Sequence, residues 1–195
     1  MRILAVADKE SVALYDYYRP GKLDGFDLIL GCGDLSEGYL EFLMTLADCP
    51  LVYVHGNHDE NHKKVPLGCI CADDKVVEVA GLRILGLGGS MKYREGKYMY
   101  SERRMRLRIL RRKFSIMRHG GIDVLLTHAP ARGLNDLEDL PHRGFQCFHK
   151  LLKKYKPALF VHGHVHREYN HNIPQRTIHN GTLVVNAFGY AVIEI

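Results

Sequence analysis

The chain has 195 residues, of which 46% are hydrophobic and 25% are charged, and its formal net charge is +5. This balance is typical of a soluble globular protein and excludes a disordered, collagenous or disulfide-rich chain. No apolar run approaches the roughly 18 residues that a membrane span needs, so we expect no membrane partner. The odd number of cysteines, with no C-x-x-C pair, favours a reducing, cytoplasmic compartment.

Apolar runs alternate with amphipathic segments at the start of the chain. The predicted strands are 2–7, 27–30 and 51–54. Ser11 is a candidate N-cap for a helix over 11–18, and Ser36 is one for a helix that ends near Asp48. This rhythm predicts parallel βαβ units with right-handed crossovers.

The middle of the chain begins with a predicted hairpin, which is followed by a basic helix and further α/β segments. The expected elements are strands 75–79 and 82–87 joined at Ala80-Gly81, a helix within 101–118, strand 122–127, helix 145–155, strand 158–161, and antiparallel strands 182–186 and 191–195. No repeat, low-complexity tract or linker interrupts them. We therefore expect one domain over residues 1–195.

The positive charge is concentrated in the basic helix. Residues 101–118 hold seven Arg and Lys113 against Glu102, a local sum of +7, so the other residues sum to −2. The charge therefore does not require a nucleic-acid partner. Apolar residues at helical spacing predict a face against the core, with the arginines in solvent: Met105, Ile109, Leu110, Phe114 and Met117. A surface for an acidic partner, a second copy of the chain or nucleic acid is the alternative.

Five strand-like runs each end in a group that can bind a metal ion. In open α/β sheets, ligands bind outside the carboxyl ends of the strands. A lone Asp or His at such a position is more often a turn, cap or loop residue, but the joint recurrence indicates a clustered site. The residues are Asp8, Asp34, Asn57 with His58, His128, and His164 with His166.

These strand ends carry motifs that resemble the calcineurin-like metallophosphoesterases. The matching stretches, in the family's order, are Gly33-Asp34, Gly56-Asn57-His58-Asp59, Thr127-His128-Ala129-Pro130 and Gly163-His164-Val165-His166. The resemblance implies a four-layer αββα sandwich with mixed sheets and two divalent metal ions at the strand ends. It implies that Asp34 bridges the metals, that Asp8 and His166 hold one, and that Asn57, His128 and His164 hold the other. His58 would contact the phosphate and assist the leaving group, oriented by Asp59.

The residue chemistry agrees with that assignment. A bridging carboxylate can hold two cations about 3.5–4 Å apart, and such a pair lowers the pKa of a bridging water. Imidazole, carboxylate and amide donors without a thiolate suit Mn²⁺, Fe, Zn²⁺, Co²⁺ or Ni²⁺, and we expect Mn²⁺.

One position departs from the family's first motif, Asp-x-His, which reads Asp8-Lys9-Glu10 here. Glu10 could ligate the same ions and would favour harder metals such as Mn²⁺ or Mg²⁺. The alternative is that Glu10 points away as the first residue of a helix, where the dipole favours acids.

Other polar residues are less specific. Ser90 and Lys92, in the loop 88–94, suit phosphate contact, with an ordinary hairpin exit as the alternative. His142 and Arg143 are candidates for the pocket mouth. Six other histidines have no motif context and are expected at the surface or as satisfied residues: His55, His62, His119, His149, His171 and His179. His162, one residue before the Gly-His-x-His motif, alternates to the other face of its strand and is expected to be structural. Cys69 and Cys71 face the same way on an extended segment, which is more typical of small apolar side chains than of metal ligands.

The leading hypothesis is a dinuclear metal-dependent phosphoesterase that hydrolyses a small phosphodiester, or a phosphomonoester, by attack of a metal-bound hydroxide. The alternative is a weakly catalytic or non-catalytic protein-binding scaffold, since the resemblance extends to a eukaryotic retromer subunit that serves chiefly in protein binding. Loss of the His of the first motif would fit a protein that has lost catalytic activity, whereas the other intact metal ligands argue against the scaffold hypothesis. A nuclease acting on long nucleic acid is the third hypothesis and predicts salt-sensitive binding.

Overall fold

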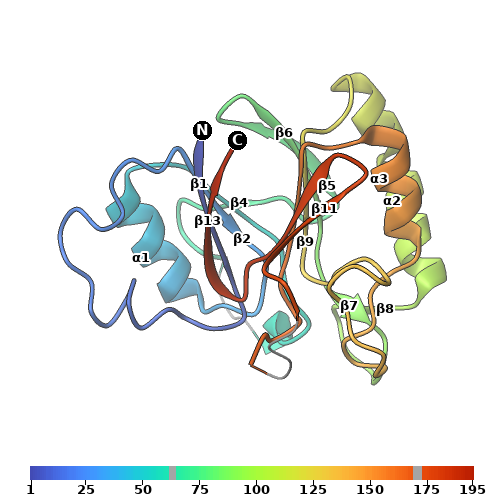
Figure 1. The fold of residues 1–195 in the computed structure, drawn as a ribbon, viewed down its shortest axis with the longest axis horizontal. Coiled ribbons are helices and arrows are strands. Elements are labelled where there is room, and N and C mark those ends of the chain that lie inside the picture. The colour runs from blue at the N-terminus through green and yellow to red at the C-terminus, as the bar shows by residue number, and fades with distance from the viewer. Residues whose placement is uncertain (62–64, 169–172) are drawn as a thin grey trace.

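The computed structural model describes residues 1–61, 65–168 and 173–195 (Figure 1). One sheet has the strand order β13 (Gly189–Glu194), β1 (Arg2–Ala7), β2 (Leu28–Gly31), β3 (Leu51–Tyr53) and β4 (Ile70–Cys71). The second has the order β11 (Arg176–His179), β12 (Thr182–Asn186), β10 (Leu159–His162), β9 (Val124–Thr127), β6 (Leu82–Leu87) and β5 (Lys75–Val79). The short strands β7 (Ser90–Met91) and β8 (Met99–Tyr100) pair with each other, and η1 (Asp59–Asn61) is a single 3₁₀ turn.

Helices cover the outer faces of the two sheets. Figure 1 shows α1 (Glu37–Ala47) on one side, and α2 (Glu102–Arg118) with α3 (Cys147–Tyr155) on the other. Side chains of β1 alternate between two cores, as the period of a strand requires. Ile3 and Ala5 face the second sheet, whereas Leu4 packs under α1. The predicted four-layer αββα sandwich is therefore confirmed.

Parallel pairing brings the carboxyl ends of the central strands to one edge of the sandwich. β1, β2, β3 and β4 are parallel neighbours, and so are β6, β9, β10 and β12. The edge strands β13, β11 and β5 are antiparallel to their partners. The predicted antiparallel strands 182–186 and 191–195 are present as β12 and β13, which belong to different sheets and are antiparallel to β11 and β1, respectively.

The predicted helix over 11–18 is wrong, since these residues form successive turns. Tyr15 packs edge-on against Tyr39 and Phe42 of α1, at ring-centroid distances of 5.3 and 4.7 Å, and Tyr18 also contacts Phe42. Aromatic residues have modest helix propensity. Residues 11–18 are therefore held by the packing of their tyrosines against α1 and not by the hydrogen bonds of a regular helix.

The predicted apolar face of the basic helix is correct for Met105 and for Ile109, which is partly buried against the same core, but wrong for the other three residues. Leu110, Phe114 and Met117 are 56%, 72% and 60% exposed. Arg108 takes a buried position instead, because its guanidinium donates to Asp74 Oδ1 at 2.8 Å and to the Gly88 carbonyl at 2.7 Å. It also lies 4.1 Å from the centre of the Tyr100 ring.

Removing that guanidinium should cost considerable stability. In Arg108→Met, the Gly88 carbonyl loses its donor and Asp73, 3.6 Å away, loses a cation. We expect the free energy of unfolding to fall by about 2–4 kcal/mol. Urea denaturation measures the change, with Arg111→Met, at an exposed site on the same helix, as the control. Equal midpoints for the two variants would contradict the expectation.

No helix in the described ranges is both long enough and apolar enough to cross a membrane.

Candidate metal centre

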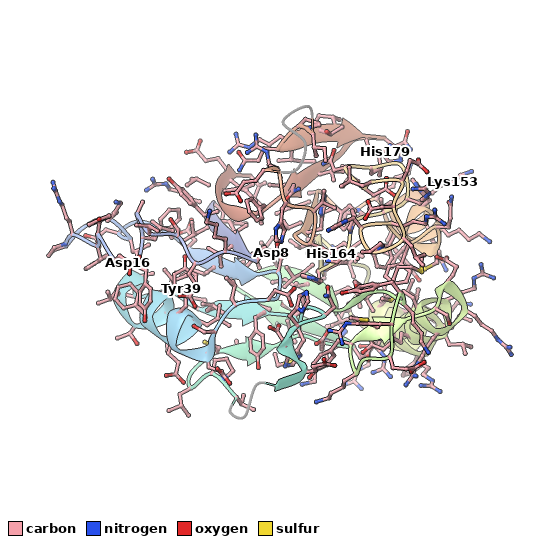
Figure 2. The ribbon with its side chains drawn as sticks, turned by 90° about the horizontal axis from the view of Figure 1, so that it is seen from below. Asp8, Asp16, Tyr39, Lys153, His164 and His179 are labelled. Atoms are coloured by element: carbon pink, nitrogen blue, oxygen red, sulfur yellow. The ribbon has the colours of Figure 1, made fainter. Side chains whose placement is uncertain are left out.

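The predicted ligands lie directly after strands that run to the shared edge. Asp8 follows β1, Asp34 lies three residues after β2, and His128 follows β9. His164 follows β10, and its backbone N–H donates to Asp8 Oδ2 at 2.8 Å. Figure 2 shows Asp8 and His164 next to each other in the middle of the molecule. The carboxyl edges of both sheets thus contribute to one site.

Three of these residues have left-handed backbone conformations. The φ angles of Asp8, Asp34 and His164 are 63°, 57° and 66°. Non-glycine residues adopt this region rarely, and such strain persists where surrounding contacts hold it. The Asp8 N–H donates to the Gly33 carbonyl at 3.1 Å, and the Asp34 N–H donates to Asp59 at 3.0 Å. Backbone strain therefore gathers at the residues whose side chains form the site.

The donor atoms of the site lie within a few ångströms of one another. Ligand atoms of Asp8, Asp34 and His128 are all within 4.8 Å of each other. His128 Nε2 lies 3.4 Å from Asp34 Oδ2 and 2.9 Å from Asn57 Oδ1, and His166 Nε2 lies 3.7 Å from Asp8 Oδ1. These residues, apart from the fully buried His128, line a cavity of about 400 Å³. The structure thus brings together all six residues that the family motifs supply as ligands.

Carbonyl groups behind the site orient two of the imidazoles. His128 Nδ1 donates to the Cys32 carbonyl at 2.7 Å, which turns Nε2 toward the carboxylates. His164 Nε2 donates to the Pro141 carbonyl at 2.7 Å, which leaves Nδ1 for the site. Such backing hydrogen bonds fix the tautomer and ring orientation of ligating histidines. Sequence reasoning missed both carbonyls, because they come from residues distant in the chain.

Asp59 connects two of the ligand loops. Its Oδ2 accepts from the backbone N–H of Asp34 at 3.0 Å and of Gly56 at 2.7 Å. The side chain of His58 lines the cavity, and its backbone N–H donates to Asp34 Oδ1 at 2.8 Å. Asp59 is therefore a positioning residue for the loops, whereas orientation of the His58 ring by Asp59 stays a prediction.

Burial and charge act against each other on the central pair. Burial opposes the charged forms, but the His128 imidazole and the His58 N–H hold the pKa of Asp34 well below its ordinary value. Burial likewise opposes protonation of His128, yet the Asp34 carboxylate raises the pKa of His128 to about 10. Without metal, a proton on His128 thus neutralises the carboxylate. The pKa of His164 lies well below its usual value, mainly because the ring is buried and to a smaller extent because His128 is positively charged. This favours the neutral form of His164, which is the form that binds metals.

One orphaned oxygen shows that these residues fit a cation. Asp8 Oδ1 is buried and has no hydrogen-bond partner within the described part of the chain. A buried carboxylate oxygen without a donor is costly unless a cation neutralises it. Oxygen and imidazole donors in this number suit two divalent ions.

The predicted peripheral residues lie in other places. The Ser36 hydroxyl, at the N-cap of α1, donates to Glu10, and Glu10 does not line the cavity. Ser90 is fully buried and donates to the Met91 carbonyl, and Lys92 pairs with Glu95 at 2.6 Å. Arg143 donates to the Glu138 carbonyl. The structure therefore does not bring Glu10, Ser90, Lys92 or Arg143 into the cavity.

Tyr93 and His142 line the cavity wall, His142 as predicted for the pocket mouth. The Asn57 amide lies 3.5 Å from the Tyr93 hydroxyl, and the His142 ring is 5.4 Å from that of His164. The sequence signal for Tyr93 was its loop, 88–94. His162 is buried behind the site, and burial lowers its pKa to about 4, as expected of a structural histidine. His62 and His171 lie outside the described residues.

Comparisons with known proteins agree with this fold. The model of the family described as calcineurin-like phosphoesterase matches residues 5–168. A comparison with curated proteins finds no match. One solved crystal structure superimposes with a TM-score of 0.62 at 13% identity, covering 98% of this chain and 94% of the other. The crystal structure of TT1561 of Thermus thermophilus superimposes with a TM-score of 0.60 at 15% identity, covering 96% and 88%. At these identities the likeness supports the fold, while the family match covers most of the sequence: the chain belongs to the calcineurin-like phosphoesterase family.

Proposed function

We propose that the chain is a dinuclear metal-dependent phosphoesterase that hydrolyses a small phosphodiester. The observation that carries the proposal is the convergence of six oxygen and nitrogen donors at one cavity of about 400 Å³. A cavity of this size accommodates a nucleotide-sized ester. The preference for a diester over a monoester follows the resemblance to compact family members.

In this mechanism the protein supplies side chains that would hold two metal ions next to the phosphate group of the substrate. With two divalent ions bound, Asp34 would contribute its carboxylate to both, Asp8 and His166 would hold one, and Asn57, His128 and His164 would hold the other. When bound, two divalent cations polarise the phosphoryl oxygens and lower the pKa of a water molecule. Oxygen and nitrogen donors favour Mn²⁺ here, with Fe, Zn²⁺, Co²⁺ and Ni²⁺ as alternatives.

His58 is placed to act on the leaving group. Its side chain is exposed at the cavity and is held near Asp34 by its own backbone N–H. The imidazole ring donates a proton to the departing oxygen, which avoids expulsion of a free alkoxide. Tyr93 and His142 contact the parts of the ester beyond the phosphate.

The experiment is hydrolysis of bis(4-nitrophenyl) phosphate with Mn²⁺, followed by a panel of cyclic nucleotides, dinucleotides, sugar phosphates and aryl monoesters. We expect His58→Ala to lower kcat about 10²–10⁴-fold, the range of general acid catalysis, with unchanged metal content. His119→Ala is the matched control, since His119 caps α2 and binds the Ser115 carbonyl. Full activity in His58→Ala would contradict the role of His58, and no turnover with any metal would contradict the proposal.

A scaffold is the second candidate, and one observation favours it. Leu107, Leu110, Phe114 and Met117 form an exposed apolar stripe on α2 among its arginines, a pattern that suits an acidic, partly apolar partner. Metal analysis after incubation with Mn²⁺ and dialysis separates the candidates. Fewer than one bound ion per chain would favour the scaffold. Cytoplasmic location and self-association stay predictions.

A further inference from the structure

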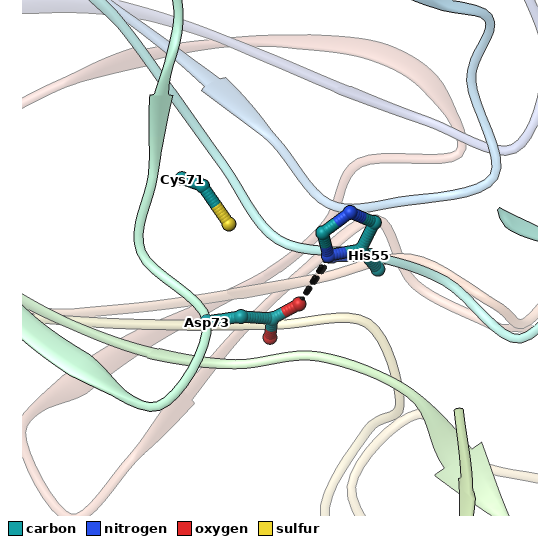
Figure 3. A group of neighbouring side chains, drawn as sticks. All are labelled: His55, Cys71 and Asp73. Atoms are coloured by element: carbon teal, nitrogen blue, oxygen red, sulfur yellow. Dashed lines mark hydrogen bonds and ion pairs between the residues drawn. The ribbon is translucent and has the colours of Figure 1, made fainter. Parts of the chain in front are cut away.

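A second group of potential metal ligands lies next to the segment that carries Asn57 and His58, outside the cavity described above. Figure 3 shows His55, Cys71 and Asp73 with their side chains directed at one another. His55 comes two residues after β3, Cys71 ends the neighbouring β4, and Asp73 lies in the loop that leads to β5. One ligand atom of each lies within 4.8 Å of those of the other two.

The spacing is close to that of a bound transition-metal ion. Three atoms no more than 4.8 Å apart all lie within about 2.8 Å of a common point, and zinc bonds are about 2.3 Å to sulfur and 2.0–2.1 Å to imidazole. His55 Nδ1 already lies 2.5 Å from Asp73 Oδ2. Side-chain movements of about 1 Å or less, including a small separation of these two atoms, therefore suffice to bring a sulfur, a nitrogen and an oxygen to one ion.

The surroundings hold two of the ligands in place. Asp73 accepts from the His55 backbone N–H at 3.0 Å and from the Gly88 N–H at 2.6 Å. Tyr98 stacks flat on the His55 ring at 4.7 Å. The side chains of His55 and Asp73 are 21% and 15% exposed, so an ion reaches them from solvent. Supporting hydrogen bonds of this kind orient ligands before the metal binds.

The charges also balance. A Cys71 thiolate and the Asp73 carboxylate would together carry two negative charges, equal to one divalent cation. The Arg108 guanidinium lies 3.6 Å from Asp73 Oδ1, the oxygen that the His55 ring does not contact. Arg108 can therefore remain in place while the ion contacts Oδ2.

We propose that His55, Cys71 and Asp73 bind one thiophilic divalent cation of the Zn²⁺ class, separate from the dinuclear centre. Binding releases the thiol proton of Cys71 and the ring proton that His55 shares with Asp73. The thiolate gives this site a selectivity that the oxygen- and nitrogen-lined cavity lacks, since thiolates favour Zn²⁺ and Co²⁺ over Mn²⁺. Three protein ligands leave a fourth tetrahedral position open.

The site is connected to the proposed active site through the backbone. The His55 carbonyl accepts from the Gly89 N–H at 2.7 Å, and its own N–H is held by Asp73. Asn57 follows two residues later. A metal ion on the His55 ring therefore stiffens the segment that carries Asn57 and His58.

Co²⁺ titration of the metal-free full-length chain under anaerobic, reducing conditions tests the proposal. Thiolate coordination produces an intense near-ultraviolet charge-transfer band, which oxygen and nitrogen ligands at the dinuclear centre do not produce. At saturating Co²⁺ we expect the band amplitude to correspond to one thiolate-bound Co²⁺ per chain in the wild type and in Asp34→Asn, and the band to disappear in Cys71→Ser. Cys49→Ser is the matched control, because Cys49 is a partly exposed free thiol elsewhere and its loss should leave the band unchanged.

A second measurement covers the case in which Cys71→Ser fails to fold. In the wild-type chain, enough Zn²⁺ to fill the dinuclear centre and this site should slow alkylation of Cys71 at least tenfold, as followed by peptide mass mapping, with Cys49 unaffected. No charge-transfer band, or a band that survives in folded Cys71→Ser, would overturn the proposal. Neither readout depends on phosphoester hydrolysis, so this proposal and the proposed function can fail independently.

Discussion

Replacing Asp34 by Asn is expected to lower kcat for Mn²⁺-dependent hydrolysis of bis(4-nitrophenyl) phosphate by about 10³-fold or more. Asp34 is the carboxylate proposed to bridge the two ions, and its Oδ2 lies 3.4 Å from His128 Nε2. Asparagine keeps the size of the side chain, and its carbonyl can still accept from the His58 N–H. It lacks the negative charge that two cations share. Elemental analysis should therefore show the loss of at least one ion per chain.

Asp123→Asn is the matched control for that experiment. Asp123 is also an aspartate with a lowered pKa, here caused by its hydrogen bonds from Arg83, but it precedes β9 and lies at the opposite edge of the sheet from His128. Its removal should lower stability and leave kcat and metal content unchanged. An Asp34→Asn variant with two bound ions and wild-type kcat would contradict the proposed bridging role.

The parts of the fold that could be predicted are those encoded in short stretches of sequence. The predicted strand 2–7 contains an uninterrupted apolar run after Arg2 and coincides with β1. Ser36 caps α1 through its own side chain, which accepts from the Tyr39 N–H. The ligand set could be predicted for a further reason. Parallel strands have their carboxyl ends at the same edge of a sheet, so residues from five distant segments can be predicted to meet there even when their contacts are unknown.

The parts that could not be predicted depend on partners distant in the chain. Ser90 looked like a phosphate ligand, but β7 pairs with β8 and buries its hydroxyl. Arg108 looked like one of several solvated arginines, yet Asp74 and the Gly88 carbonyl bind it beneath α2. Arg108 is thus buried on the face of α2 that packs on the core, while Phe114 is exposed. The sequence pattern of a helix indicates which of its faces is apolar and which is charged. It does not indicate which charged side chain has a buried hydrogen-bond partner elsewhere in the chain.

Gly56 shows how closely the backbone approaches the proposed bridging carboxylate. A Cβ atom at this position would lie 2.0 Å from Asp34 Oδ1, 2.5 Å from its Cγ and 2.6 Å from its backbone nitrogen. These distances are far inside van der Waals contact, and the Asp34 backbone is itself held by Asp59. The carboxylate therefore has to move away from its position beside His128.

Gly56→Ala is consequently expected to lower Mn²⁺-dependent kcat by about 10²-fold or more and the free energy of unfolding by about 1–3 kcal/mol. Gly38→Ala is the control: Gly38 lies in α1, a Cβ there meets nothing within 4 Å, and the substitution should raise stability by about 0.5–1 kcal/mol. Activity assays, metal analysis and urea denaturation on both variants measure these effects. A displaced Asp34 carboxylate would lose the ions as well as the activity. A Gly56→Ala chain that still binds two Mn²⁺ would therefore show that the loop around Gly56 can move while Asp34 stays in place. That result would contradict the close packing of Gly56 on Asp34 as the factor that holds the carboxylate in position.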